Sequence, residues 1–305
     1  MTRALLVVNP SSGRELATAS SAMISERLRE QYSTVDVSVT QGDGDAGEAA
    51  GQAVRNGCDA IIVAGGDGTL NEVFNAVVAE AAIDRMTFGI IPMGTGNDFS
   101  AALGIRPDVD AALQVISRGR TVAVDVGMVN GRAFLNTSGG GFIAEVSIAV
   151  TPQLKTIAGR LAYLVGGTQV LMEYDPVRAT VTAEPDGIRI GLGLYAFAVC
   201  NSPLIGGGRL IAPRALLDDG LLDVCLIEAM SSLEFVALAR KVAGGDHVAD
   251  DRVRYLQASS VRIEVEREIH VNTDGEVFPA TVCEYTVLPR AATFLVGDAP
   301  FMSPT

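Results

Sequence analysis

Hydrophobic and polar residues are arranged in two different ways along the chain, and the first arrangement covers roughly the first 125 residues. Short apolar runs bounded by turn residues predict four strands there, at 4–9, 35–39, 60–65 and 88–92. The segments between them carry apolar side chains at helical spacing, which predicts helices over 15–31, 45–56 and 69–82. Strands that alternate with helices in this way predict a parallel sheet with helices on both faces.

The second arrangement begins after about Val124, where short apolar runs follow one another through turns that contain Gly, Asn, Asp or Pro. Several of these runs alternate apolar and polar residues, as "VRIEVE" (261–266) does. We predict an antiparallel β domain of two packed layers. Two helices should interrupt it, over about 142–172 and over 231–243, and the second should start with a capping box of Ser231 and Glu234.

Length and charge narrow the class of protein. The chain has 305 residues, more than most single cores contain, so two domains are expected. Its net charge of −13 and the lack of a basic block argue against general nucleic-acid binding, which depends on Lys and Arg at phosphates. The same charge gives no overall attraction to an anionic membrane surface.

The placement of the cysteines and the length of the longest apolar run indicate in which cellular compartment the protein resides. Cys58, Cys200, Cys225 and Cys283 are far apart and lie in or beside apolar runs, which predicts buried free thiols in a reducing environment. The longest uninterrupted apolar stretch, 190–200, has 11 residues, well short of a membrane-spanning helix. Together these features predict a soluble cytoplasmic protein.

Polar, glycine-containing loops follow the four predicted strands: "NPSSG" (9–13), "TQGDG" (40–44), "GGDGT" (65–69) and "PMGTGND" (92–98). Parallel strands end at a common edge, and ligands of such sheets bind beyond that edge. In "GGDGTLNE", Thr69 and Glu72 have the spacing of a capping box, so a helix should begin at about Leu70. The free N–H groups of its first turn would favour phosphate. A plain turn in which Asp67 bonds its own backbone explains this loop alone equally well.

Two further loops repeat the design. "PMGTGND" offers two glycines, a Thr95 hydroxyl for phosphate, and Asn97 or Asp98 as a helix cap. "NPSSGR" offers a polar nest, to which Arg14 adds a cation. Taken singly, each of these loops is also explained as an ordinary turn, but their common edge favours a phosphate site.

Two acidic turns lie in the second half of the chain. "DDGLLDV" (218–224) is either ordinary turn chemistry or a site for a hard cation such as Mg²⁺ or Ca²⁺. "HVNTDGEVF" (270–278) predicts a β-hairpin through Asp-Gly. Asp274 and Glu276 are either turn residues or a carboxylate that accepts a hydroxyl proton as general base.

Five motifs occur in one order along the chain: "NPSSG", "GGDGTLNE", "PMGTGNDF", "APRALLDDGLLDV" and "NTDGE". Together they resemble the diacylglycerol kinase catalytic-domain family of lipid kinases, in its soluble bacterial branch, which is related to sphingosine kinases. The "GGDGT" loop alone is also similar to loops of NAD kinases and phosphofructokinases. The set of five extends from Asn9 to Glu276, nearly the whole chain.

The resemblance implies an α/β N-terminal domain with a parallel sheet similar to those of phosphofructokinase and NAD kinase, and a C-terminal antiparallel β-sandwich. The nucleotide-binding domain would comprise residues 1–124 and 290–305, and the lipid-substrate domain residues 125–289. The implied activity is ATP- and Mg²⁺-dependent phosphorylation of a lipid hydroxyl, with diacylglycerol giving phosphatidic acid. The partner would be a lipid at the membrane surface, contacted transiently and peripherally from the cytoplasm, and a homodimer is left open.

Carried over by motif, the resemblance also implies site residues. The nucleotide contacts would be Asn9, Pro10, Ser11, Ser12, Gly13, Thr40, Gly65, Gly66, Asp67, Gly68, Thr69, Leu70, Asn71, Glu72, Gly94, Thr95, Gly96, Asn97 and Asp98. Asp67 would take part in the catalytic Mg²⁺ network, and Asp219 with main-chain oxygens of Leu216 and Leu221 would hold a structural Mg²⁺. The proton acceptor would be Asp274 or Glu276.

Two alternatives stay open. An NAD kinase shares the α/β domain, the "GGDGT" loop and a β-rich second domain, although "DGE" and "NPSSG" speak against it. A non-catalytic nucleotide- or lipid-binding protein is the other, and the acidic residues kept in every loop speak against that.

Overall fold

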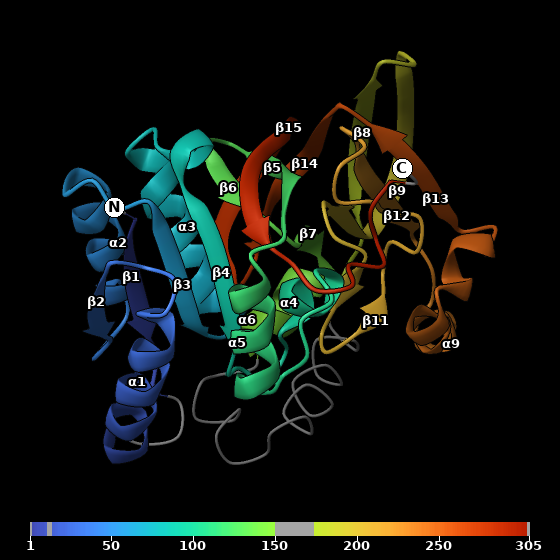
Figure 1. Cartoon of the computed structure of the whole chain (residues 1–305). Coiled ribbons are helices and arrows are strands. Elements are labelled where there is room, and N and C mark those ends of the chain that lie inside the picture. The colour runs from blue at the N-terminus through green and yellow to red at the C-terminus, as the bar shows by residue number, and fades with distance from the viewer. Residues whose placement is uncertain (1, 11–13, 150–173, 304–305) are drawn as a thin grey trace.

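The first third of the chain forms a parallel sheet in the computed structural model, which describes residues 2–10, 14–149 and 174–303 (Figure 1). Its strands are β1 (Arg3–Val8), β2 (Thr34–Val39), β3 (Ala60–Gly65) and β4 (Thr87–Pro92). They pair in the order β2-β1-β3-β4, all parallel. Every residue of β3 is buried, as expected for a strand covered on both faces. The four strands predicted from the sequence are confirmed.

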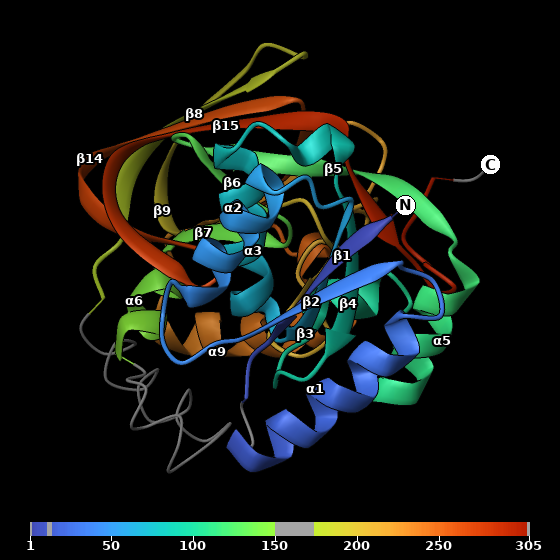
Figure 2. The ribbon, with the colours of Figure 1, turned by 60° about the vertical axis from the view of Figure 1, so that its left-hand side comes forward.

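Helices cover both faces of this sheet. They are α1 (Arg14–Leu28), α2 (Asp45–Arg55), α3 (Asp67–Ala79), α4 (Asp98–Ala102) and α5 (Val109–Arg118), with a short 3₁₀ helix at Ile83–Arg85. Figure 2 shows α1 and α5 on one side of the strands and α2 and α3 on the other. The three helices predicted from apolar spacing are therefore confirmed, with shifted ends.

The second half is antiparallel and β-rich, as predicted. Its strands are β5 (Thr121–Val129), β6 (Arg132–Phe134), β7 (Thr137–Gly141), β8 (Val177–Glu184), β9 (Ile188–Cys200), β12 (Leu222–Glu228), β13 (Val253–Ala258) and β14 (Ser260–Thr273), with a separate hairpin of β10 (Leu204–Ile205) and β11 (Arg209–Leu210). Helices α6 (Phe142–Ala149) and α9 (Ser232–Lys241) and 3₁₀ turns at Val242–Gly244 and Asp246–Ala249 accompany them. Many of their buried side chains form two cores that are separate from the main core of the α/β half.

One long strand, β15 (Glu276–Leu295), joins the two halves. It pairs antiparallel with β14 and β5, and near its end Thr293 and Phe294 pair in parallel with β4. The Phe294 ring lies 5.1 Å from the rings of both Phe88 and Phe99 in the core of the α/β half. One hydrogen-bonded sheet therefore runs through both halves. The division of domains at 124/125 and 289/290 stays a prediction.

The helix ends test the capping predictions. The capping box of Ser231 and Glu234 is confirmed at the start of α9. The one predicted for Thr69 and Glu72 is wrong, because α3 begins at Asp67 with Gly66 as its N-cap and no side-chain cap. Both side chains instead bond to neighbouring loops.

Other predictions are met in part. Helix α6 covers only the start of the helix predicted over 142–172, and residues 150–173 lie outside the described part of the chain. The cysteines are free thiols; Cys58 is half-buried and the other three are buried.

Candidate active site

The loops after β3 and β4 touch through their backbones. A Cβ atom placed on Gly94 would lie 2.5 Å from Cα of Gly66, and one placed on Gly66 would lie 3.1 Å from Cα of Gly94. Gly94 therefore has no room for a side chain, and Gly66 has little. Asn97 holds the second loop in shape: its Oδ1 accepts a hydrogen bond from the Gly94 N–H at 2.9 Å, and its Nδ2 donates to the Gly94 carbonyl at 2.7 Å. Close approach of the two loops thus accounts for one glycine in each motif, Gly66 and Gly94.

Asp67 connects these two loops at the start of α3. Its carboxylate accepts hydrogen bonds from the N–H groups of Asp98 (3.2 Å) and Phe99 (3.3 Å), at the start of α4. Asp67 therefore bonds the next loop, which the reading of "GGDGT" as a self-contained turn did not foresee. Burial, and then the charge of Asp98, raise the pKa of Asp67.

Asp98 carries the connection into the β-rich half. Its carboxylate, 8% exposed, accepts hydrogen bonds from the N–H groups of Gly207 (2.9 Å) and Gly208 (2.7 Å) between β10 and β11. The cap predicted for Asn97 or Asp98 is not made by either side chain, since Asn97 occupies the N-cap without a side-chain bond. The Asn97 side chain instead bonds Gly94 within its own loop, and the Asp98 side chain bonds the β10–β11 loop.

A cavity of about 320 Å³ opens beside these loops, a size at the lower end for small-molecule sites. It is lined by Asn9, Pro10, Thr40, Gln41, Gly42, Asp43, Ala46, Thr69 and Glu72. Asn9 Nδ2 donates to Thr69 Oγ1 at 2.8 Å, and Glu72 accepts from the Gly44 N–H at 3.2 Å. A larger hollow of about 620 Å³ on β8, β9 and β14 contains none of the residues predicted for the site.

The remaining nucleotide candidates differ in exposure. Gly68, Thr95 and Gly96 are exposed, whereas Leu70 and Asn71 are each 3% exposed and point into the protein. Ser11, Ser12 and Gly13 lie outside the described residues. Gly65 ends β3. The nucleotide contacts as a set stay a prediction.

Asp274 reaches the same region from the other half of the chain. It occupies the predicted hairpin turn, where Asp274 (φ 46°) and Gly275 (φ 100°) both have left-handed backbones. Its carboxylate accepts hydrogen bonds from the N–H groups of Leu135 (2.7 Å), Asn136 (3.1 Å) and Thr137 (2.9 Å). Burial, together with a smaller effect of the charge of Asp67, raises its pKa to about 6 against the lowering effect of these bonds.

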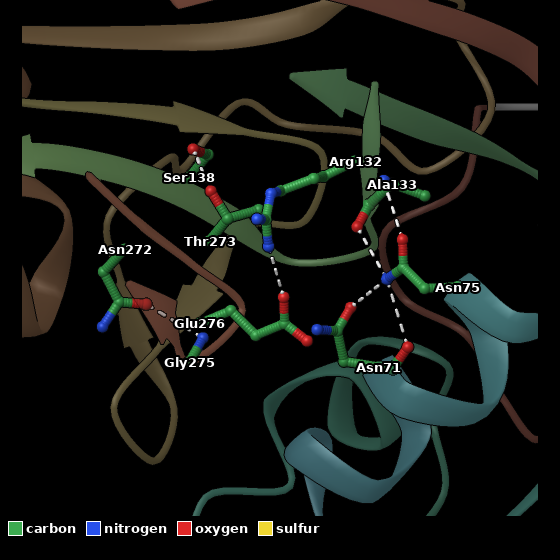
Figure 3. A network of polar contacts seen from close by, with 9 residues as sticks. All are labelled: Asn71, Asn75, Arg132, Ala133, Ser138, Asn272, Thr273, Gly275 and Glu276. Carbon is green, nitrogen blue, oxygen red and sulfur yellow. Dashed lines mark hydrogen bonds and ion pairs between the residues drawn. The ribbon is translucent and has the colours of Figure 1, made fainter. Parts of the chain in front are cut away.

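Glu276 has a different environment. It is half-exposed and forms an ion pair with Arg132 at 2.9 Å (Figure 3). The Arg132 guanidinium also lies over the Phe278 ring, 4.9 Å from its centroid. The charge of Glu276 contributes, after burial and the charge of Asp43, to a raised pKa of Glu72 at the cavity. The two carboxylates of "DGE" therefore face different parts of the site.

The predicted cation loop is acidic and well bonded. Burial, followed by the charges of Asp125 and Asp218, raises the pKa of Asp219, which accepts a hydrogen bond from the Leu221 N–H at 3.0 Å. Within residues 2–10, 14–149 and 174–303, no group of three or more His, Cys, Asp or Glu residues is arranged to hold a metal ion. The assignment of Leu216, Asp219 and Leu221 to Mg²⁺ stays a prediction.

Two polar residues near the site, Asp125 and Asn75, bond distant parts of the chain and were not identified from the sequence. Asp125, fully buried in β5, accepts hydrogen bonds from the N–H groups of Gly220 (2.6 Å) and Arg290 (2.7 Å). Asn75 in α3 bonds the backbone of Ala133 in β6. The sequence signals were a lone carboxylate inside an apolar strand, and two asparagines, Asn71 and Asn75, one helical turn apart on a half-buried helix.

Known proteins resemble this chain in both sequence and fold. A family model described as "Diacylglycerol kinase catalytic domain" matches residues 3–129. The chain is 36% identical over 278 residues to the diacylglycerol kinase of Bacillus subtilis, covering 90% of each. The chain belongs to the diacylglycerol kinase family of lipid kinases.

Further matches support this family. A second family model, "YegS C-terminal NAD kinase beta sandwich-like domain", matches residues 139–296 of this diacylglycerol kinase family member. A Shewanella frigidimarina protein named "Probable lipid kinase YegS-like" is 30% identical over 270 residues, covering 88% of this chain and 86% of its own. The crystal structure of a diacylglycerol kinase from Bacillus anthracis superposes with a TM-score of 0.81 at 28% identity, covering 97% of this chain and 98% of its own. The resemblance and the fold class inferred from the sequence are confirmed.

Among the described residues, no helix is long and apolar enough to cross a membrane.

Proposed function

We propose that this lipid kinase transfers the γ-phosphoryl group of ATP to the free hydroxyl of diacylglycerol, giving phosphatidic acid, with Asp274 as the general base. One observation carries the proposal: a partly buried carboxylate with a pKa raised to about 6 is held by three backbone N–H groups within electrostatic reach of Asp67 at the start of α3. The names of the relatives support the acceptor. A general base works best when its pKa lies near the operating pH.

In the proposed step, the lipid hydroxyl oxygen forms a bond to the γ-phosphorus while its proton passes to the Asp274 carboxylate. The bond from the γ-phosphorus to the bridging oxygen breaks, and ADP leaves with that electron pair. The glycine loops and the N-terminus of α3 would hold the phosphates through backbone N–H groups. Most of the rate enhancement would then come from position and electrostatics.

The acidic residues at the loops after β3 and β4 fit a divalent cation bound with ATP. Asp67 is partly buried beside Asp98, and the charge of Asp67 also acts on Asp274. Mg²⁺ is commonly held by one or two carboxylates together with substrate phosphates and water, so a full protein cage is not needed. When bound, Mg²⁺ would neutralise charge on the phosphates. Asp67 is the residue we expect to interact with it.

Glu276 is the weaker candidate for the base. Its carboxylate is half-exposed and already paired with Arg132, and its charge acts on Glu72 at the cavity. We propose that Glu276 shapes the mouth of the nucleotide cavity. Because the lipid resides in a membrane, we also propose a transient, peripheral encounter with the membrane surface from the cytoplasm; a homodimer stays a prediction.

The test is transfer of labelled phosphate from ATP to vesicles that contain diacylglycerol, with separation of the lipid products. Asp274→Asn should lower kcat by about 10²–10⁴-fold and retain nucleotide binding, whereas Glu276→Gln should retain a measurable kcat. NAD⁺ replaces the lipid in a parallel reaction, because the second family model names an NAD kinase-like sandwich. Labelling of NAD⁺ in place of lipid, or full activity of Asp274→Asn, would overturn the proposal.

A further inference from the structure

We propose that Asn75 is a positioning residue, whose side-chain amide fixes β6 against α3 and thereby sets the separation between the phosphate-binding end of α3 and Asp274. The inference rests on the proposed function, because that function assigns roles to both ends. Asn75 itself does not face the cavity lined by Asn9 and Glu72.

The amide of Asn75 pairs with both polar groups of one residue in the other half of the chain. Its Nδ2 donates to the Ala133 carbonyl at 3.1 Å, and its Oδ1 accepts from the Ala133 N–H at 3.0 Å. Figure 3 shows these bonds between α3 and β6. Two antiparallel bonds fix both the distance and the orientation of the two segments, much as a pair of bonds does between strands.

Asn71 fixes the amide from the helix side. Asn75 Nδ2 also lies 2.8 Å from Asn71 Oδ1 and 3.1 Å from the Asn71 carbonyl, and Asn71 is 3% exposed. All three groups around Nδ2 are acceptors, so only one orientation of the amide satisfies them. The side chain is therefore oriented before it bonds Ala133.

The segment that Asn75 holds leads directly to the base. Ala133 is 1% exposed, and the next residues along the chain after β6 include Leu135, Asn136 and Thr137, whose N–H groups bind Asp274. On the other side, Asn75 is on the same rigid helix as Asp67, about two turns from its start. The path from phosphate loop to base thus consists of one helix, one amide pair and the short segment between β6 and β7. A misplacement of about 1 Å can cost about 10²-fold in rate.

Asn130 provides a matched control. Its Nδ2 donates to the Val282 carbonyl at 2.9 Å, and its Oδ1 accepts from the Glu284 N–H at 2.9 Å. The same two-bond pair is made, but both partners belong to the β-rich half. Asn130 has a left-handed backbone (φ 47°), which Asp also tolerates. Asn75→Asp and Asn130→Asp therefore each replace one donor by a repelling oxygen. Asn130 is exposed and bonds two residues, whereas Asn75 is half-buried and bonds both backbone groups of Ala133.

The kcat for lipid phosphorylation should distinguish Asn75→Asp from Asn130→Asp. Asn75→Asp should lower kcat by about 10–10²-fold and leave the Kd of a non-hydrolysable ATP analogue within about twofold of wild type, because the phosphate loop is untouched. The acidic limb of its pH–rate profile should move to higher pH, since displaced N–H groups no longer favour the charged form of Asp274. Asn130→Asp should keep kcat within about twofold and the same profile. Asn75→Ala, which adds no charge, should repeat the result if Asn75→Asp does not fold.

Amide hydrogen exchange gives a readout that needs no lipid. Exchange at Leu135, Asn136 and Thr137 should accelerate at least about tenfold in Asn75→Asp, but not in Asn130→Asp. Unchanged exchange at these three residues, or a kcat equal to that of the control, would overturn the inference. If wild-type protein labels no lipid, the proposed function fails while the exchange comparison still decides whether Asn75 holds this segment. If Asp274→Asn is inactive and Asn75→Asp is fully active, only the inference fails.

Discussion

Gly94→Ala tests whether the contact between the two glycine loops is required. The new Cβ would lie 2.5 Å from Cα of Gly66 and 2.9 Å from Oδ1 of Asn97. Carbon atoms in contact prefer a separation of about 3.5–4.0 Å, so the loops must move apart by about 1 Å. Overpacking of this kind costs about 1–3 kcal/mol in the free energy of unfolding. A shift of that size at a site that holds phosphate should also lower kcat/KM for ATP by about 10²-fold.

Thermal unfolding and nucleotide titration measure the two effects separately. A loss of 1 kcal/mol lowers the Tm of a domain of 150–250 residues by about 2–4 °C. Gly191→Ala is the control, since a Cβ there meets nothing within 4 Å, and it should leave both Tm and kcat/KM close to wild type. If Gly94→Ala has the Tm and the ATP kinetics of Gly191→Ala, the loops do not need their backbone contact, and the argument for this edge as the phosphate site is refuted.

Three further predictions concern the charged groups of the site. As base, Asp274 is active only when ionised and its pKa is raised to about 6, so kcat/KM should fall about tenfold per pH unit below that value and level off above it, as a pH–rate profile of the free enzyme would show. Arg132→Ala should leave Tm nearly unchanged, because exposed ion pairs contribute about 0–1 kcal/mol to the free energy of unfolding. It should raise the KM for ATP roughly fivefold, because the negative charge of Glu276 is then no longer neutralised. An unchanged KM would contradict this. Asp98→Ala leaves the N–H of Gly207 without its carboxylate and should lower the free energy of unfolding by about 1–3 kcal/mol in denaturant titration; a loss no larger than for an exposed Asp→Ala change would count against it.

The sequence predicted those parts of the fold that depend on local pattern. Strands such as β3 and β4 were found because they are apolar runs that end at turn residues. The Asp-Gly hairpin was found for the same reason, since the turn needs two left-handed residues.

The sequence did not predict which partner a polar side chain chooses. Thr69 and Glu72 have the spacing of a capping box, yet Thr69 bonds Asn9, 60 residues away, and Glu72 bonds the Gly44 N–H. Asp274 fits a turn residue by composition, yet its carboxylate binds N–H groups about 138 positions earlier in the chain. Spacing reports only neighbours along one element, while these bonds depend on how distant loops meet at the sheet edge.

The path of β15 has a consequence for the order in which the protein can fold during synthesis. Strands β1 to β4 leave the ribosome first, and domains commonly fold in that order. Here the outer edge of β4 and the ring position beside Phe88 and Phe99 are filled by Thr293 and Phe294, near the C-terminus. The β4 edge of the parallel sheet therefore stays unpaired until almost the whole chain is made, and an unpaired strand edge favours aggregation. Loss of residues 291–305 would damage the half of the protein that was synthesised first.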